Sequence, residues 1–161
     1  MKKLFFIASL FLSLETIAQH KTFSGRWAID QDKSLLGQLP IDYLPKEIKI
    51  SQQSDHVIIE RTYVDDGKDR VIAETLAYDG KKCFTTSYSG KKWSSTFVWD
   101  NDQEKFAEQI ITTTINGEPY LQATEICALN EDGAALVIDR YVEQSDGRKY
   151  LIKVYYLRTN Q

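Results

Sequence analysis

The sequence contains few of the residues from which catalytic and metal sites are usually built. Its 161 residues include only two histidines, His20 and His56, and two cysteines, Cys83 and Cys127. A histidine-based metal site or a Ser-His-Asp triad requires more imidazoles, or better placed ones. The motifs Gly-x-Ser-x-Gly and His-Glu-x-x-His and a phosphate-binding glycine loop are also missing. We therefore expect no catalytic residues, no metal and no cofactor, and an enzyme is the weakest of our hypotheses.

An excess of positive charge and long apolar runs are absent as well. The chain has 20 Lys and Arg residues against 23 Asp and Glu, which gives a formal net charge of −3. A nucleic-acid partner needs a basic patch or stripe, so we do not expect one. The one prominent apolar run, Leu4 to Leu14, is shorter than the roughly 20 residues that span a bilayer. We expect no membrane span in the chain that follows it.

The start of the chain has the pattern of a cleaved export signal. Two lysines precede the apolar run, and Thr16 and Ala18 provide small side chains before a cleavage point. We predict a helical signal peptide over residues 1–18, cleaved near Ala18, which places the protein in the periplasm or outside the cell. Residues 19–161 are then long enough for a single domain with its own core.

The rest of the sequence has the composition of β-strands separated by tight turns. It is rich in Val, Ile and Thr, and the chain contains 3 Trp, 9 Tyr and 7 Phe. These residue types suit a pleated, half-buried surface. Dipeptides typical of hairpin turns recur along the chain: Ser54-Asp55, Asp66-Gly67, Asp79-Gly80, Ser89-Gly90, Asn101-Asp102, Asn116-Gly117, Asp132-Gly133 and Asp146-Gly147. Eight such turns link nine strands from about Glu47 onward, and Phe23 to Asp30 adds a tenth.

No segment after the signal region has a convincing helical period. The connection from Gln31 to Lys46 contains Pro40 and Pro45. It has room for one helical turn, but not for the two-helix lid of intracellular fatty-acid carriers. Ten antiparallel strands in consecutive hairpins leave exposed edges, which closure into a barrel removes. We predict an all-β fold, an antiparallel up-and-down β-barrel of about ten strands, with a two-sheet sandwich as the alternative.

The first predicted strand resembles the opening of the lipocalins. Gly25-Arg26-Trp27 is similar to their Gly-x-Trp signature, and Phe23 to Asp30 as a whole is similar to the opening of small exported bacterial lipocalin-like (calycin) proteins. The resemblance implies a ligand-binding barrel whose floor Trp27 closes, with a basic residue near the chain end lying across this tryptophan. Arg158 is the position that matches. Ten strands exceed the eight of a standard lipocalin, which leaves open a ten-stranded calycin relative.

An internal echo in the sequence provides candidate binding residues. The segments 57–61 and 136–140, Val-Ile-Ile-Glu-Arg and Leu-Val-Ile-Asp-Arg, share one pattern, and a glycine-containing turn follows each. Strand alternation places Arg61 and Arg140 on the same face as the apolar residues two and four positions earlier. Two guanidiniums near a barrel mouth would suit an anionic head group, because the planar fork meets a carboxylate bidentately.

The alternative for these arginines is internal pairing. Glu74 lies on the strand after Arg61, and Glu125 lies on the strand before Arg140, so both are candidate cross-strand partners. A buried charge without a partner is costly, and such partners are expected in either case.

Aromatic side chains are the second set of binding candidates. Phe97 and Trp99 share one strand face, and Tyr155 belongs to a tyrosine cluster in the last hairpin. Ligand pockets are mostly apolar with a few placed polar groups, and tyrosine and tryptophan supply both. We assign these three residues to the ligand-binding set, with barrel core as the alternative. Gly25 and Trp27 are assigned to structure.

The two cysteines allow a disulfide in an exported protein. In an up-and-down order, Cys83 at the start of the fifth strand and Cys127 at the end of the eighth lie at the same end of the barrel. They would have to meet across the interior to satisfy the geometry of the bond. Two buried free thiols are the alternative.

The sequence leaves two functional hypotheses of different classes. The first is an exported lipocalin-like protein that binds a small lipophilic or amphipathic molecule, with an anionic group in reach of the arginines. The second is a structural or protein-interaction module of the cell envelope without a small-molecule ligand. The interior volume separates them, because a barrel packed solid with side chains has no room for a ligand.

Overall fold

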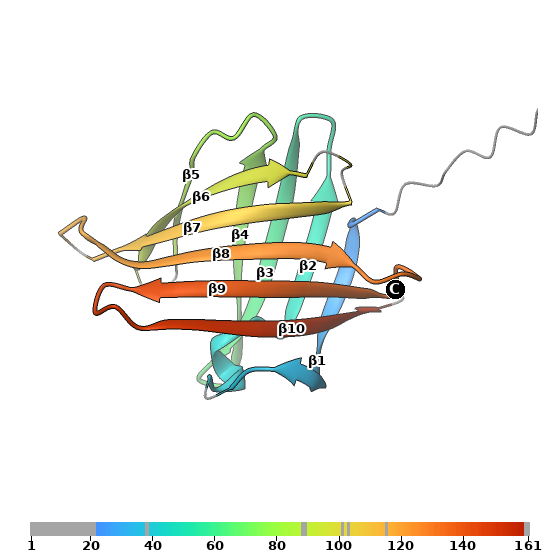
Figure 1. The fold of residues 1–161 in the computed structure, drawn as a ribbon, viewed down its shortest axis with the longest axis horizontal. Coiled ribbons are helices and arrows are strands. Elements are labelled where there is room, and N and C mark those ends of the chain that lie inside the picture. The colour runs from blue at the N-terminus through green and yellow to red at the C-terminus, as the bar shows by residue number, and fades with distance from the viewer. Residues whose placement is uncertain are drawn as a thin grey trace, which may run out of the picture.

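The computed structural model describes residues 22–37, 39–87, 90–100, 102, 104–114 and 116–159. The predicted signal peptide, residues 1–18, lies outside these described residues. The described residues form ten strands and one short 3-10 turn (Figure 1). The elements are β1 Gly25–Leu35, η1 Ile41–Tyr43, β2 Glu47–Gln52, β3 His56–Asp65, β4 Lys68–Ala77, β5 Cys83–Thr86, β6 Lys92–Trp99, β7 Lys105–Thr113, β8 Pro119–Leu129, β9 Ala135–Gln144 and β10 Lys149–Thr159.

The strands form one antiparallel sheet in the order β4-β3-β2-β1-β10-β9-β8-β7-β6-β5. Figure 1 shows this sheet curled on itself, with β7 to β10 crossing in front of β2 to β4. Consecutive strands are neighbours except β4 and β5, and the first strand pairs with the last, which is the up-and-down pattern of a barrel. The all-β fold and the barrel of ten antiparallel strands predicted from the sequence are confirmed.

The barrel is nearly, but not completely, closed by hydrogen bonds. The two end strands of the sheet are β4 and β5, and within the described part of the chain no strand pairing joins them. We call this line the seam. The short length of β5, Cys83–Thr86, limits the exposed edge that the seam leaves.

Local sequence explains where the strands end. Each of the eight hairpin dipeptides falls between two consecutive strands. In the β3–β4 hairpin, Asp66 and Gly67 have φ angles of 50° and 70°. A two-residue turn with positive φ at both positions matches the right-handed twist of the strands, and Asp-Gly adopts it at little cost.

The connection between β1 and β2 differs in part from the prediction. Gln31 was expected to begin the connection, but the strand continues to Leu35, and its pairing with β10 shifts register between Asp30 and Leu35. The strand thus bends and serves both halves of the sheet. The predicted single helical turn is present as Ile41–Tyr43. Among the residues that the structure describes, no helix has the length and apolarity to cross a membrane.

The interior has two different ends. The end formed by the β2–β3, β4–β5, β6–β7 and β8–β9 turns is filled by aromatic rings, and we call it the closed end. Neighbouring ring centroids there lie 4.9–5.8 Å apart. The rings belong to Phe23, Tyr78, Phe97, Trp99 and Phe106. Packing of this kind leaves no room for a ligand at this end of the interior. We call the other end the open end.

Candidate functional site

A cavity of about 380 Å³ occupies the open end of the barrel. Its wall is formed by η1, the ends of β3 and β4, the β5–β6 turn and the interior faces of β6 to β9. The lining residues combine aromatic, aliphatic and charged side chains. They are Asp42, Tyr43, Arg61, Tyr63, Val64, Asp65, Ile72, Glu74, Ser87, Lys91, Trp93, Ile110, Thr112, Tyr120, Glu125 and Arg140.

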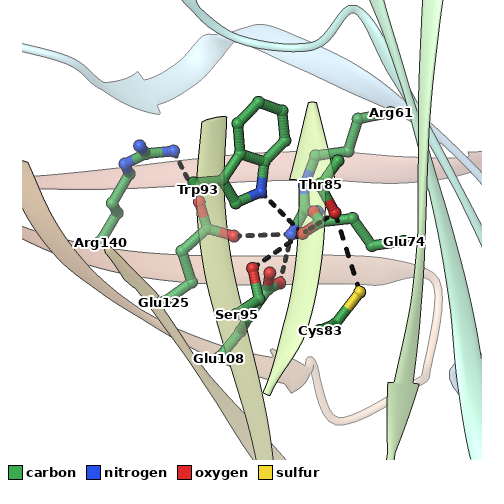
Figure 2. Close-up of polar contacts among 9 residues, drawn as sticks. All are labelled: Arg61, Glu74, Cys83, Thr85, Trp93, Ser95, Glu108, Glu125 and Arg140. Atoms are coloured by element: carbon green, nitrogen blue, oxygen red, sulfur yellow. Dashed lines mark hydrogen bonds and ion pairs between the residues drawn. The ribbon is translucent and has the colours of Figure 1, made fainter. Parts of the chain in front are cut away.

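The floor of the cavity is a buried cluster of charges. Arg61 donates a hydrogen bond from Nη1 to Glu74 Oε2 at 2.5 Å and from Nη2 to Glu125 Oε2 at 3.1 Å. The same Nη2 also donates to Glu108 Oε2. The four side chains come from β3, β4, β7 and β8, and Figure 2 shows them converging on the Arg61 guanidinium. We call these residues, together with Arg140, the charge cluster.

Strand register explains why these charges meet. Glu108, Glu125 and Arg140 are successive cross-strand partners on β7, β8 and β9. Two glutamates directly opposite each other repel, so the pair requires a counter-charge. Arg61 supplies it from the opposite wall of the barrel, where Ile59, two residues earlier, is the partner of Glu74.

Arg140 lies on the solvent-facing side of the charge cluster. Its Nη1 donates a hydrogen bond to Glu125 Oε1 at 2.6 Å. Its side chain is 24% exposed, whereas that of Arg61 is 8% exposed. Arg140 is thus the cation of the cluster that a molecule in the cavity reaches first, since the Arg61 guanidinium is enclosed by three carboxylates.

Glu74 connects the two sides of the seam. Its Oε1 accepts hydrogen bonds from Trp93 Nε1 and Ser95 Oγ, both at 2.7 Å, and from Thr85 Oγ1 at 3.4 Å. The donors lie on β5 and β6, while Glu74 lies on β4, so side-chain bonds replace the missing strand pairing (Figure 2). One carboxylate therefore serves both as a partner of Arg61 and as a link across the barrel wall.

Glu108 is the member of the charge cluster whose negative charge is least compensated. It is fully buried, and its Oε1 has no hydrogen-bond partner among the residues that the structure describes. Burial, which the Arg61 charge only partly offsets, together with the charges of Glu74 and Glu125, raises the pKa of Glu108 to about 7. Burial also favours the neutral form of Glu125, but Arg140 and Arg61 outweigh it and hold the pKa of Glu125 below its usual value. Three carboxylates and two guanidiniums carry a net charge of −1, and a proton on Glu108 balances it.

The centre of the charge cluster is occupied by a guanidinium. Within the described residues, no group of His, Cys, Asp and Glu is arranged to hold a metal ion. The Arg61 guanidinium occupies the position between the three carboxylates, where a cation of any kind would otherwise be attracted.

The structure places the predicted arginines and glutamates together. The ion pairs of Arg61 with Glu74 and of Arg140 with Glu125 are both present, as the internal-pairing alternative required. Glu108 is not among the residues that the sequence predicts for the site. Its signal is the strand alternation on β7, where it stands between the buried residues Phe106 and Ile110.

The predicted aromatic set is not part of the cavity. Phe97 is 1% exposed, and together with Trp99 it belongs to the ring cluster of the closed end. Tyr155 lies on the outer face of β10, because Val154 and Tyr156 on either side of it are buried. The aromatic residue of β6 that lines the cavity is Trp93. It lies four residues before Phe97 and therefore on the same interior face of the strand.

The possible disulfide between the two cysteines is not formed, and both are free thiols, Cys127 buried and Cys83 partly buried. Cys83 is the partner of Ser95 on β6, whereas Cys127 connects through Phe106 to Trp99 on that strand. The two rows are four residues apart along β6, about 13 Å at 3.3 Å per residue. A disulfide requires Cα atoms within about 7 Å of each other, so this stagger excludes the bond.

The residues assigned to structure close the end opposite the cavity. Trp27 is fully buried, and its Nε1 donates to the Phe23 carbonyl at 3.0 Å. The Arg158 guanidinium lies over the Trp27 ring, 4.1 Å from its centroid. Gly25 has a φ of +147°, which favours glycine, and a Cβ atom there would lie 2.7 Å from Arg158 Nη1 and displace the guanidinium. This is the arrangement that the resemblance to lipocalins implies.

Solved structures of known proteins share the fold of this chain. No family model matches the chain, and no curated protein sequence matches it either. The zebrafish ileal bile acid-binding protein, solved in complex with cholic acid, superposes with a TM-score of 0.54 at 15% identity, over 85% of this chain and 98% of its own. A mutant of the fluorescent protein UnaG superposes with a TM-score of 0.55 at 16% identity, over 86% and 97%. Both have the fatty-acid-binding-protein-like barrel of the calycin fold, and this chain shares that fold.

Proposed function

We propose that the protein binds a small, largely apolar molecule in the cavity at the open end of its barrel. The observation that carries the proposal is the cavity of about 380 Å³, in a barrel whose other end is filled by aromatic rings. Ligand pockets commonly have volumes of about 300–1,000 Å³ and apolar walls with a few polar groups. Tyr63, Trp93 and Ile110 supply the apolar surface here.

An anionic group on the ligand would be placed by Arg140 rather than by Arg61. Arg61 is enclosed by three carboxylates, whereas Arg140 is partly exposed and its ion pair with Glu125 uses Nη1. Lys91 contributes a further cation to the wall, and Asp42 and Asp65 contribute negative charge. The mixed signs suit an amphipathic molecule whose single polar group lies beside Arg140. One protein of the same fold is a bile acid-binding protein, which is consistent with a ligand in such a barrel.

Binding of a neutral apolar dye, phenyl-naphthylamine, tests the proposal. Dye fluorescence should rise on binding, and Thr112→Trp should weaken the rise because Thr112 lines the cavity and the larger side chain occupies part of it. Thr96→Trp makes the same change on the neighbouring strand β6, at a position whose neighbours Ser95 and Phe97 are buried and which therefore faces outward. It should leave binding intact.

Two results would contradict cavity binding. The first is a folded protein that does not bind the dye. The second is dye binding that both tryptophan variants weaken equally, which would place the dye on the outer surface. Either result would favour a structural or protein-interaction role without a small-molecule ligand.

We also propose that the protein acts outside the cytoplasm. The support is the pattern of residues 1–18, two lysines followed by an apolar run and small residues before Ala18. Expression of the full chain in a bacterial host, followed by fractionation and N-terminal sequencing, tests it. A mature chain in the periplasm or medium that begins at Gln19 supports export, and a cytoplasmic chain that retains residues 1–18 contradicts it.

A further inference from the structure

The charge cluster under the cavity has one carboxylate more than it has guanidiniums. Arg61 and Arg140 face Glu74, Glu108 and Glu125, and all five are at least three-quarters buried. Buried charges of this kind are stable only when they are balanced and hydrogen-bonded. The imbalance is located at Glu108, whose Oε1 is buried without a partner.

The Glu108 carboxylate does not line the cavity wall, but it interacts electrostatically with residues that do. Arg61 and Glu125 both line the cavity, and both border Glu108, the first through a hydrogen bond and the second as its cross-strand partner. A negative charge beside Arg140 and Arg61 would compete with Glu108 for the same positive charge. The ionised form of Glu108 would then be less stable than in the empty barrel.

We propose that Glu108 takes up a proton when an anionic molecule enters the cavity, so that the protein binds anions more tightly as the pH falls. The proton comes from the solvent and joins the Glu108 carboxylate, and it leaves again when the anion dissociates. A neutral molecule of the same shape leaves the charge balance unchanged and is bound without proton uptake. The inference rests on the proposed function, because it needs a molecule in the cavity.

The titratable groups around Glu108 leave it as the proton acceptor near neutral pH. The charged or titratable neighbours on the packed elements are Arg61 and Tyr63 on β3, Glu74 on β4, Glu125 and Cys127 on β8, Arg140 on β9 and Tyr156 on β10. Burial raises the pKa of Tyr63, Cys127 and Tyr156, so these groups stay neutral. The guanidiniums stay charged, and the pKa of Glu125 is lowered. Glu108, with a pKa of about 7, is placed to exchange its proton in the physiological range.

The direction of the pH effect follows from linkage. An anion that raises the proton affinity of Glu108 must bind more tightly to the protonated protein. The affinity is therefore high below the pKa of about 7 in the empty protein, and it falls as the pH rises through that value.

Two dyes of nearly the same shape test the inference. Anilinonaphthalene sulfonate carries a sulfonate that does not titrate in the range used, and phenyl-naphthylamine is its neutral counterpart. The dissociation constant of the anionic dye should rise about threefold or more from about pH 6 to about pH 8.5, and that of the neutral dye should stay constant. The wild-type protein should also take up protons with the anionic dye, measured by calorimetry at about pH 7.5 in buffers of different ionisation enthalpy.

Glu108→Gln removes the titrating group and keeps the side-chain shape. The variant should bind the anionic dye with a constant affinity, close to that of the wild type at low pH. Glu118→Gln makes the same chemical change at an exposed position in the β7–β8 turn and should keep the wild-type pH dependence. Thermal unfolding checks that both variants are folded, and the calorimetry on the wild type stands independently of them.

The outcomes separate the inference from the proposed function. Loss of pH dependence in Glu108→Gln alone, together with proton uptake by the wild type, supports the inference. If both dyes bind in the cavity with pH-independent affinity and without proton uptake, the inference is wrong and the proposed function stands. If neither dye binds at any pH, the proposed function is wrong and the inference falls with it.

Discussion

The Arg158 guanidinium lies 4.1 Å from the centroid of the Trp27 ring and joins the end of the chain to its beginning. Nη1 and Nη2 each donate a hydrogen bond of 2.9 Å, to the carbonyls of Ser24 and Thr22. The contact covers the buried indole at the closed end. It therefore stabilises the barrel at the end opposite the cavity, and its loss should change stability without changing the binding site.

Replacement of Arg158 by alanine should lower the free energy of unfolding by about 2–3 kcal/mol. The estimate combines a cation–π contact of about 1 kcal/mol with two hydrogen bonds from a charged group. Arg158→Lys should recover part of the loss, because an ammonium keeps the charge but not the planar fork. Urea unfolding at equilibrium measures both. Arg148→Ala, at a side chain that is 74% exposed, should cost less than about 0.5 kcal/mol.

Substitution of Gly25 tests how tightly this contact is built. Gly25→Ala should destabilise the protein by about 2 kcal/mol or more, because φ is +147° and the new Cβ would lie 2.7 Å from Arg158 Nη1. Gly117→Ala is the matched control. Its φ is +85° but no atom lies within 4 Å of the added Cβ, so it should show only the backbone cost of about 1 kcal/mol. Equal losses in the two variants would contradict the close approach to Arg158.

The Gly25, Trp27 and Arg158 arrangement was accessible from the sequence because it depends on a short local motif. The hairpin turns were accessible for the same reason, since Asp66-Gly67 and its counterparts specify positive φ by their own side chains. Alternation then placed Arg61 and Arg140 on interior faces and named Glu74 and Glu125 as their partners.

The register between distant strands was not accessible from alternation. The sequence does not show that Arg61 reaches across the barrel to Glu108, or that Cys83 and Cys127 lie in rows four residues apart. Tyr155 and Tyr156 show the same difficulty. Adjacent residues of a strand face opposite sides of the sheet, so a shift of one residue in the pairing decides which tyrosine is buried. Contacts between neighbouring strands were predictable, whereas contacts across the interior needed the closed barrel.

Removal of the Glu74 carboxylate should open the seam. Glu74→Gln leaves Arg61 with one partner fewer and removes a charged acceptor of the Trp93 and Ser95 hydrogen bonds. Breaking a buried pair by removing one partner costs about 3–5 kcal/mol when a charge remains, and the amide should keep the loss near the lower end. Hydrogen–deuterium exchange should accelerate in β4 and β5 more than in β8 and β9.

Glu60→Gln provides the control for the seam. Glu60 lies on β3 and pairs with Lys49 at 2.5 Å, but its side chain is 32% exposed. A partly exposed ion pair contributes about 0–1 kcal/mol, so the exchange pattern should stay as in the wild type. Uniform acceleration over all strands in Glu74→Gln would show a general loss of stability rather than an opening of the seam.

The two cysteines should behave as thiols of different reactivity. Burial, with the charges of Glu125 and Glu108, raises the pKa of Cys127 well above its usual value, and the side chain is 3% exposed. Cys83 is half-buried and lies beside Thr85 Oγ1. In native protein a thiol reagent should modify Cys83 first and leave Cys127 unmodified, and in denaturant both should react. Absence of free thiols in denatured, unreduced protein would contradict the register of β5 and β8.

The free energy of unfolding should depend on pH through the protonation of Glu108, even without a ligand. The pKa of Glu108 is raised from 4.5 to about 7 in the folded state. The folded protein therefore binds more protons than the unfolded chain between these values, and its stability falls as the pH rises through this window. One pKa unit corresponds to about 1.4 kcal/mol, so the contribution lost between about pH 5 and about pH 8 is about 2.5 kcal/mol.

The contribution of Glu108 to stability must be measured as a difference between variant and wild type, because other carboxyl groups also change the stability with pH. Glu125, whose pKa is lowered, acts in the opposite sense and stabilises the fold less as the pH falls below its usual range. The free energy of unfolding of Glu108→Gln minus that of the wild type should increase by about 2.5 kcal/mol from about pH 5 to about pH 8. For the exposed Glu118→Gln the same difference should stay constant. A constant difference for Glu108→Gln as well would mean that Glu108 is ionised throughout, and that the charge cluster is balanced by a group other than this carboxyl.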